Sequence, residues 1–250
     1  MAPKSTNLES IRRRIDQIDN DLHDLFMKRA RLGAGISAAK AKGGGGPVMR
    51  PERETQVLRR LLRRNKGKLA PEVVARIWRE LFPAMVRLQG PLKVVVCGGS
   101  DPVGMWDIAR SHYGSVTSMS LVKTPGQALS AVARDQGGRG SFVAVLPMPS
   151  DRGAGLWWRK IATDREGVPR IVGKLPFLNG TATAEAVVVG CLDWKPSGDD
   201  QTLIAVTVAA KVTRKHLLGW MKSAGLPARV EASGPAAPGK RRRLHLLRVS

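Results

Sequence analysis

The apolar residues of the first forty positions follow one helical face, and Arg29 interrupts that face. The face consists of residues spaced alternately by three and four: Leu8, Ile11, Ile15, Ile18, Leu22, Leu25, Arg29, Leu32 and Ile36. This spacing is typical of one long amphipathic helix. A guanidinium that faces an apolar interior is costly unless it is paired. We therefore expect Arg29 to pair with a carboxylate or to bind an anionic ligand.

The pattern of the sequence changes near Gly90. Before it, the residues predict three helices, over about 6–42, 51–64 and 71–89, with a capping box at Thr6 and glycines or prolines at the breaks. Beyond it, the order strand, helix, strand, helix, strand is predicted over 92–97, 103–113, 116–122, 125–135 and 141–146. Further strands are expected at 170–175, 186–193, 202–209 and 245–249, with a helix at 214–224. The predicted fold class is α + α/β: a three-helix domain in residues 1–90 and an α/β domain in residues 91–250.

The net charge of +22 is divided evenly, with +11 in residues 1–90 and +11 in residues 91–250. The aromatic side chains that would stack on bases are few, so the charge favours attraction of small anions over nucleic acid binding. No apolar run is long enough to cross a membrane, and we expect a soluble, cytoplasmic protein. Cys97 and Cys191 are expected as buried thiols. The four histidines show no spacing typical of a metal site.

The length of the first helix predicts an assembly. About 35 residues make a helix of about 52 Å, whereas a compact unit of 90 residues is only about 25 to 30 Å across. The helix must therefore extend beyond its own domain, and a second copy of the chain is the simplest cover for the overhanging apolar residues. We expect an intertwined homodimer. The alternative is a helix that is kinked at Gly33 and Gly35.

Several further polar residues lie on faces that ought to be apolar. Lys40 follows Arg29 by about three turns and points the same way. Glu54, with Arg53 beside it, precedes the inward-facing leucines of the second helix, and Gln89 closes the third helix. Arg12 lies near the far end of the first helix, where an intertwined dimer would bring it to the partner's site.

These residues carry a family resemblance. The stretch from Leu8 to Asp19, then Arg29 and Lys40, then the stretch from Pro47 to Glu54, and finally Gln89, resemble the all-helical chorismate mutases. The resemblance covers nearly all of residues 8–89. It implies a domain-swapped dimer with two active sites, each completed by an arginine from the other subunit.

The resemblance also implies a reaction and roles for residues. Chorismate, a dicarboxylate, would rearrange to prephenate without a cofactor, as a step of phenylalanine and tyrosine biosynthesis. Arg12 from the partner, Arg29 and Arg53 would bind the anionic groups, because guanidinium groups suit carboxylates. Lys40 and Gln89 would donate to the ether oxygen, where negative charge develops. Glu54 would accept a hydrogen bond from the substrate hydroxyl.

Three residues depart from the family pattern. Arg50 stands where some members carry an aspartate near the substrate hydroxyl, and Met85 replaces a serine that in some members touches a carboxylate. Both positions are therefore expected at the substrate. Pro83 is expected to interrupt the third helix and to displace Gln89.

The segment beyond Gly90 resembles a degenerate form of the module that follows the mutase in bifunctional mutase and prephenate dehydratase proteins. The run Pro169–Phe177 is similar to the linker between the two lobes of the dehydratase, but the Thr-Arg-Phe signature is absent from the chain. Residues 202–249 resemble half of a small-molecule regulatory domain. We expect a dehydratase-like remnant or a regulatory module without dehydratase activity.

Two other functions fit the same residues. Isochorismate-pyruvate lyases share the helical scaffold and its cations. A non-enzymatic basic helical dimer could instead bind polyanions, as the run Lys240–Arg243 suggests, although a solvated loop before the last strand is the simpler and favoured explanation of that run.

Overall fold

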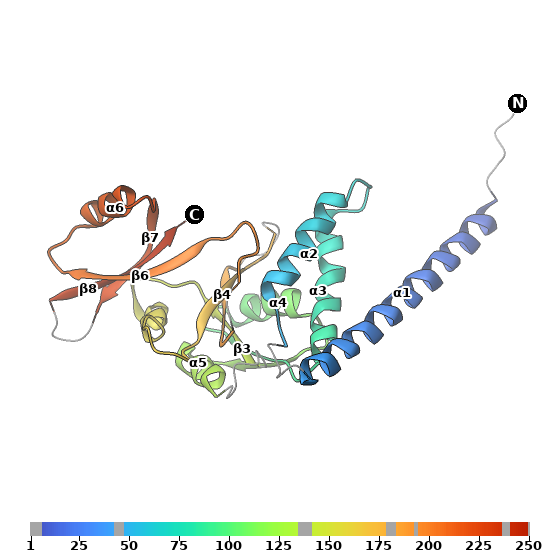
Figure 1. The fold of residues 1–250 in the computed structure, drawn as a ribbon, viewed down its shortest axis with the longest axis horizontal. Helices are drawn as coiled ribbons and strands as arrows, with labels where there is room; N and C mark the ends of the chain where they lie inside the picture. The colour runs from blue at the N-terminus through green and yellow to red at the C-terminus, as the bar shows by residue number, and fades with distance from the viewer. Residues whose placement is uncertain are drawn as a thin grey trace, which may run out of the picture.

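The computed structural model describes residues 7–42, 48–134, 142–178, 184–192, 195–236 and 241–249. Three helices lie at one end of the molecule, a five-stranded sheet lies in the middle, and a three-stranded sheet lies at the other end (Figure 1). The helices are α1 (Leu8–Lys42), α2 (Pro51–Arg64) and α3 (Pro71–Arg87). Within the described residues, no helix combines the length and the apolar character needed to cross a membrane.

The first helix is a single element that projects from the rest of the chain (Figure 1). Gly33 and Gly35 do not interrupt it, so the kinked alternative is wrong. Its packing partner is α3, near the C-terminal end of α1. The large apolar residues of its apolar face are between 40 and 66% exposed: Leu8, Ile11, Ile15, Ile18, Leu22, Leu25, Leu32 and Ile36. The apolar face of α1, here called its seam, is thus regular, but in a single chain these residues stay exposed to solvent.

The second and third helices form a pair, and each begins with a proline at its first turn. Such a proline stabilises a helix start because it has no amide hydrogen to leave unpaired. The prediction that Pro83 interrupts α3 is wrong, since the helix continues to Arg87. Phe82 and Val86, on either side of Pro83, are buried, and this packing offsets the missing backbone hydrogen bond.

The apolar spacing of the third helix predicts one buried face, and the buried face of α3 in the structure is a different one. The predicted face consists of Val74, Ile77, Leu81, Met85 and Leu88. The buried residues are Ala75, Arg79, Phe82, Pro83 and Val86, whereas Ile77 and Leu88 are exposed. The reason is that α3 packs against α2 on one side and against a helix of the α/β domain, α4 (Pro102–Tyr113), on another. Val86, together with Met49, belongs to the same apolar cluster as the central sheet. The helical segment and the sheet therefore share a core.

The central sheet confirms the predicted alternation of strands and helices. It is built from β1 (Lys93–Cys97), β2 (Ser118–Val122), β3 (Phe142–Pro147), β4 (Arg170–Leu175) and β5 (Ala186–Gly190), with α4 and α5 (Pro125–Ala133) as connections. The strand order is β2-β1-β3-β5-β4; β1 is parallel to β2 and β3, and β5 is antiparallel to its neighbours. A short helix at Gly153–Lys160, which buries Trp157 and Trp158, was not predicted. Cys97 is buried in β1, and Cys191 is partly exposed.

The last part of the chain forms a separate sheet. Its elements are β6 (Thr202–Ala209), α6 (Arg214–Ser223), β7 (Ala228–Pro235) and β8 (Arg242–Val249), in the antiparallel order β6-β8-β7. The strand β7 was not predicted from the sequence, and the predicted start of β8, at residue 245, is three residues later than the observed start at Arg242. Arg242 and Arg243, expected in a loop, are exposed residues of β8 that pair with the end of β6; residue 240 lies outside the described residues.

Candidate active site

Lys40 and Gln89 meet where the end of α1 passes the end of α3. Nζ of Lys40 donates a hydrogen bond to Oε1 of Gln89 at 3.1 Å, and Nε2 of Gln89 donates to the carbonyl of Met85 at 3.2 Å. Burial, and next the nearby Arg50 guanidinium, lower the pKa of Lys40. Gln89 lies just beyond α3, and Pro83 has not moved it away from Lys40. Two of the predicted polar residues are thus brought together.

Glu54 and Arg79 form a second pair, between α2 and α3. Nη1 of Arg79 lies 3.2 Å from Oε2 of Glu54, and the two side chains are only 6 and 16% exposed. Burial raises the pKa of Glu54 to about 7; Arg79 and Arg29 oppose this rise, and Glu52 adds to it. The Glu54 carboxyl therefore changes its charge near neutral pH.

Arg29 reaches the same region from α1. Its guanidinium carbon lies 5.8 Å from the centre of the Phe82 ring, and its charge interacts with that of Glu54. Burial lowers the pKa of Arg29. Its Nη1 atom is buried and has no hydrogen-bond partner among the residues that the structure describes. Because an unpaired buried donor is costly, Arg29 is a candidate for binding an anion.

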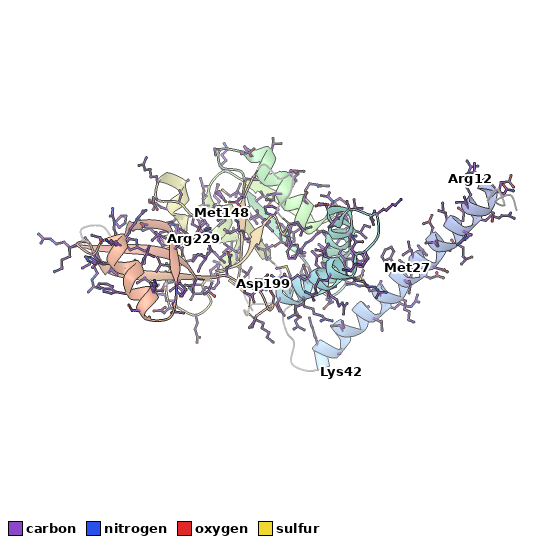
Figure 2. The ribbon with its side chains drawn as sticks, turned by 90° about the horizontal axis from the view of Figure 1, so that it is seen from above. Arg12, Met27, Lys42, Met148, Asp199 and Arg229 are labelled. Carbon is purple, nitrogen blue, oxygen red and sulfur yellow. The ribbon has the colours of Figure 1, made fainter. Side chains whose placement is uncertain are left out.

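The other predicted residues lie outside this group or at its margin. Arg53 is exposed, and its side chain makes no hydrogen bond or ion pair within the described segments. Arg50 is also exposed and pairs with Glu52 at 2.9 Å. Met85 is partly buried and contributes its carbonyl. Arg12 lies at the free tip of α1, far from Lys42 at the other end (Figure 2). One chain alone therefore does not bring Arg12 to the site.

Arg79 is the residue that the sequence analysis missed. It lies on the buried stripe of α3 between Ala75 and Phe82, at helical spacing from both. A cation within an apolar stripe is the same signal that singled out Arg29. The sequence analysis overlooked this signal because the apolar spacing of the helix predicted a buried face through Ile77 and Leu81. In the structure that face is less buried than the face that carries Arg79.

Two residues of the α/β domain, His112 and Phe177, contact the Arg79 side chain. Nη1 of Arg79 lies 3.5 Å from Nε2 of His112, a residue of α4. The guanidinium carbon lies 5.1 Å from the ring centre of Phe177, which follows β4 and packs into the apolar cluster of α2 and α3. Burial and the Arg79 charge keep the pKa of His112 well below its usual value. The imidazole is therefore neutral and can accept a hydrogen bond from Arg79.

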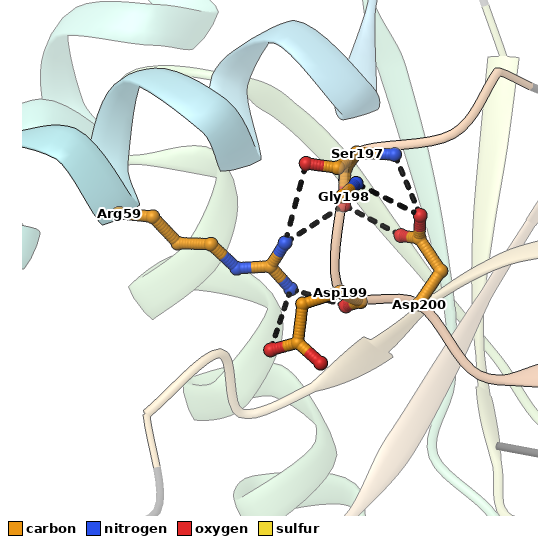
Figure 3. A network of polar contacts seen from close by, with 5 residues as sticks. All are labelled: Arg59, Ser197, Gly198, Asp199 and Asp200. Carbon is orange, nitrogen blue, oxygen red and sulfur yellow. Dashed lines mark hydrogen bonds and ion pairs between the residues drawn. The ribbon is translucent and has the colours of Figure 1, made fainter.

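Arg59 joins α2 to the segment that precedes β6 (Figure 3). Its Nη1 atom donates to Oγ of Ser197 at 3.0 Å, and its Nη2 atom lies 3.6 Å from a carboxylate oxygen of Asp199. Asp200 accepts hydrogen bonds from the backbone of Ser197 and Gly198 and so fixes the turn. The helix that carries Glu54 is thus attached to the linker of the three-stranded sheet.

The assembled group is cationic, with one carboxyl. Arg29 and Arg79 interact with Glu54, and Lys40 is hydrogen-bonded to Gln89. Such a set can bind a small anion and stabilise developing negative charge. Across the described ranges, no cluster of three or more His, Cys, Asp or Glu side chains could hold a metal ion.

The fold and the site define a class: a helical domain with partly buried cations, whose longest helix extends away from its own body, fused to an α/β domain. The family model for chorismate mutase type II matches residues 11–90, so the chain carries a chorismate mutase type II domain at its N-terminus.

Curated relatives extend this similarity beyond the helical part. A "Bifunctional chorismate mutase/prephenate dehydratase" of Pseudomonas aeruginosa is 34% identical over 147 residues, which are 56% of this chain and 38% of the relative. Proteins of the same name from Stutzerimonas stutzeri and Neisseria gonorrhoeae are 32% identical over 138 residues and 38% identical over 105 residues. They cover 53 and 41% of this chain, and 36 and 27% of the relatives.

All three alignments are longer than the helical segment, so the similarity enters the α/β domain. In each case the matched part spans less than two fifths of the relative's length. No solved structure matches the chain.

Proposed function

We propose that the N-terminal domain rearranges chorismate to prephenate. The observation that carries this proposal is the buried, unpaired Nη1 of Arg29, held near Glu54 in a domain of the matching family. In this rearrangement an ether C–O bond breaks and a C–C bond forms within one molecule, with no net proton transfer. The protein can accelerate it by holding a compact substrate conformer and by stabilising the charge that grows on the ether oxygen.

Each residue near Arg29 has a proposed role. Arg29 binds a substrate carboxylate, and Arg53, at the exposed edge of α2, can rotate toward the second anionic group. Lys40 and Gln89 donate to the ether oxygen; their mutual hydrogen bond holds both groups in place before the substrate binds. Glu54, in its ionised form, accepts from the substrate hydroxyl. Arg50 and Met85 lie beside Lys40 and Gln89 respectively, and Arg50 adds to the positive field at Lys40.

We also propose that two chains pair through α1. The exposed seam of α1 offers eight large apolar side chains, and burying one such side chain stabilises an assembly by about 1.5 to 3 kcal/mol. Two apolar residues of α3, Val73 and Ile77, are exposed as well. A second copy of this chain fits that surface because a two-fold pair presents the same apolar face on both sides.

The pairing would complete the site. Arg12 and Arg29 are separated by about 26 Å along α1, at 1.5 Å per residue. An antiparallel pair of α1 helices centred between Asn20 and Asp21 would set Arg12 of one chain beside Arg29 of the other. Each of the two sites would then hold one cation from the second chain.

For the α/β domain we propose a supporting or regulatory role without dehydratase activity. The chain matches less than two fifths of the bifunctional relatives and lacks the Thr-Arg-Phe signature. The β6-α6-β7-β8 unit is a small antiparallel sheet with one helix, attached to α2 through Arg59. We also propose a cytoplasmic location, where the substrate of a biosynthetic mutase is made.

The test offers chorismate, isochorismate and prephenate separately to the purified full chain. We expect chorismate to be consumed with formation of prephenate, isochorismate to be left intact, and prephenate to persist at neutral pH. Consumption of isochorismate alone would assign a lyase. Binding of polyanions without any turnover would assign the basic dimer. Phenylpyruvate formed from prephenate in the presence of the protein would contradict the proposed role of the α/β domain.

A further inference from the structure

Arg79 lies where three parts of the molecule meet. It belongs to α3, its Nη1 atom contacts Glu54 of α2 at 3.2 Å, and the same atom lies 3.5 Å from Nε2 of His112 in α4. The ring of Phe177, from the segment after β4, lies 5.1 Å from its guanidinium carbon. Arg79 is 5% exposed, which is rare for arginine. A buried cation of this kind is retained only when its neighbours compensate for its lost hydration.

Among the residues that the structure describes, Glu54 is the single ionic partner of the Arg79 guanidinium. His112 is neutral and accepts, and Phe82 and Phe177 offer ring faces at 5.9 and 5.1 Å. The Nε atom of Arg79 is buried without a hydrogen-bond partner in the described chain. Glu54 is therefore the group that balances its charge, and any movement of Arg79 changes the surroundings of that carboxyl directly.

We propose that Arg79 is a positioning residue for Glu54 and that the α/β domain holds Arg79 in place through His112 and Phe177. This inference rests on the proposed function, because it assigns Glu54 a substrate contact that must be aligned and charged. It makes the α/β domain a structural part of the mutase site. Phe177 is well placed for this role, since it packs in the apolar cluster of Leu58 and Phe82 between α2 and α3.

The charge of Glu54 gives the inference a measurable consequence. The groups that face Glu54 are Arg79 from α3, Arg29 from α1 and Glu52 from its own helix, with His112 and Tyr113 of α4 behind Arg79. Burial already raises the pKa of Glu54 to about 7, and Arg79 is the strongest group that opposes the rise. Removing Arg79 should therefore raise this pKa further, by roughly one to three units for the loss of an adjacent opposite charge.

The first experiment measures kcat/KM for chorismate against pH in the full chain with Arg79→Gln. We expect the acid limb of the profile to move upward by at least about one pH unit, so that activity is at least about fivefold lower at pH 7 and recovers as the pH is raised toward 9. Arg79→Lys, which keeps the charge, should shift the limb by less. A folded Arg79→Gln protein with an unshifted limb, or with a loss that is equal at every pH, would overturn the proposal.

Arg76→Gln is the matched control. Arg76 lies one turn before Arg79 on the same helix and also reaches α4, where its Nη1 atom donates to Oγ of Ser111 at 2.8 Å. The variant removes the same charge from the same helix, but Arg76 is exposed and does not contact Glu54. We expect a profile like that of the wild type. If the acid limb of Arg76→Gln were shifted as far as that of Arg79→Gln, the loss of one positive charge would explain both shifts. That result would overturn the positioning role of Arg79.

The second experiment tests the contribution of the α/β domain and does not depend on turnover. The pKa of Glu54 is followed by the carbon-13 shift of its carboxyl in the wild type, His112→Leu, Phe177→Leu and Arg79→Gln, with Glu54→Gln to assign the signal. We expect upward shifts in all three variants, largest for Arg79→Gln. Unchanged values for His112→Leu and Phe177→Leu would overturn the role of the domain. Should the wild type fail to consume chorismate, only the proposed reaction falls, and these titrations still decide whether Arg79 sets the charge of Glu54.

Discussion

Nζ of Lys40 and Oε1 of Gln89 lie 3.1 Å apart, although 49 residues separate them in the chain. This hydrogen bond joins the last turn of α1 to the end of α3. It fixes an amine and an amide on one side of the proposed site before any ligand binds. Preorganisation of this kind is worth most when the groups face developing charge.

Replacement of Lys40 or Arg29 by alanine should each reduce kcat/KM for chorismate by at least about 100-fold, because each variant removes a cation that the proposed transition state requires. The measurement is chorismate consumption at equal concentration of folded protein. Lys42→Ala and Lys28→Ala are the controls, since both side chains are exposed on the same helix. Near-normal turnover with Lys40→Ala and Arg29→Ala would contradict the mechanism.

The exposed seam of α1 predicts that a charge placed on it abolishes the homodimer. Leu22→Asp would bury a carboxylate in the proposed interface, so we expect a monomer by sedimentation and a loss of chorismate turnover. Asn20→Asp adds the same charge at an exposed position on the opposite side of the helix and should remain a dimer. If the wild type itself sediments as a monomer and is active, the shared site is wrong.

Mixed dimers provide a test of the role proposed for Arg12. A dimer of one Arg12→Ala chain and one Lys40→Ala chain contains one site with both cations intact and one site that lacks both. After random exchange of equal amounts, half of the dimers are mixed, and the activity should return to about a quarter of the wild-type value. Mixtures no more active than the separate variants would show that Arg12 acts within its own chain or has no role.

The buried Glu54 should make the protein less stable as the pH rises. A carboxyl whose pKa is about 7 when folded, and near its ordinary value when unfolded, holds its proton more tightly in the native state. Its stabilising effect is complete below the unfolded pKa and is lost as the pH increases through about 7. The loss amounts to at most about 3 kcal/mol, at 1.36 kcal/mol per pKa unit.

The measurement for this prediction is the free energy of unfolding in urea between pH 4.5 and 8, for the wild type and Glu54→Gln. The difference between the two proteins isolates Glu54 from the opposite contribution of His112, whose lowered pKa stabilises the native state above pH 6.5. We expect Glu54→Gln to gain stability relative to the wild type as the pH rises. A difference that does not change with pH would mean that Glu54 titrates normally.

The sequence was sufficient for the elements whose signals are local. The starts of α2 and α3 follow from Pro51 and Pro71, and the length of α1 from a regular three-and-four spacing that continues on both sides of Arg29. The alternation that gave β1, α4, β2, α5 and β3 was equally clear. By contrast, β7 was missed because Ala228–Pro235 contains few β-branched or aromatic residues and is specified by its pairing with β8.

The site was only partly predictable because its packing is not local. Arg29, Lys40, Glu54 and Gln89 could be identified from helical spacing and from the family resemblance. The structure pairs Lys40 with Gln89 and places the charge of Arg29 near that of Glu54. Arg79 could not be ranked above other arginines without knowing that the α/β domain covers its face of α3. The side chains of His112 and Phe177 decide that burial, and neither lies in the helical segment.

The free-standing α1 ties the proposed catalysis to protein abundance. A lone chain is folded around its sheets but lacks the second chain's Arg12, so dilution below the dissociation constant would switch off turnover without any unfolding. The specific activity would then depend on the protein concentration by mass action, and it would rise with that concentration until all chains are dimeric.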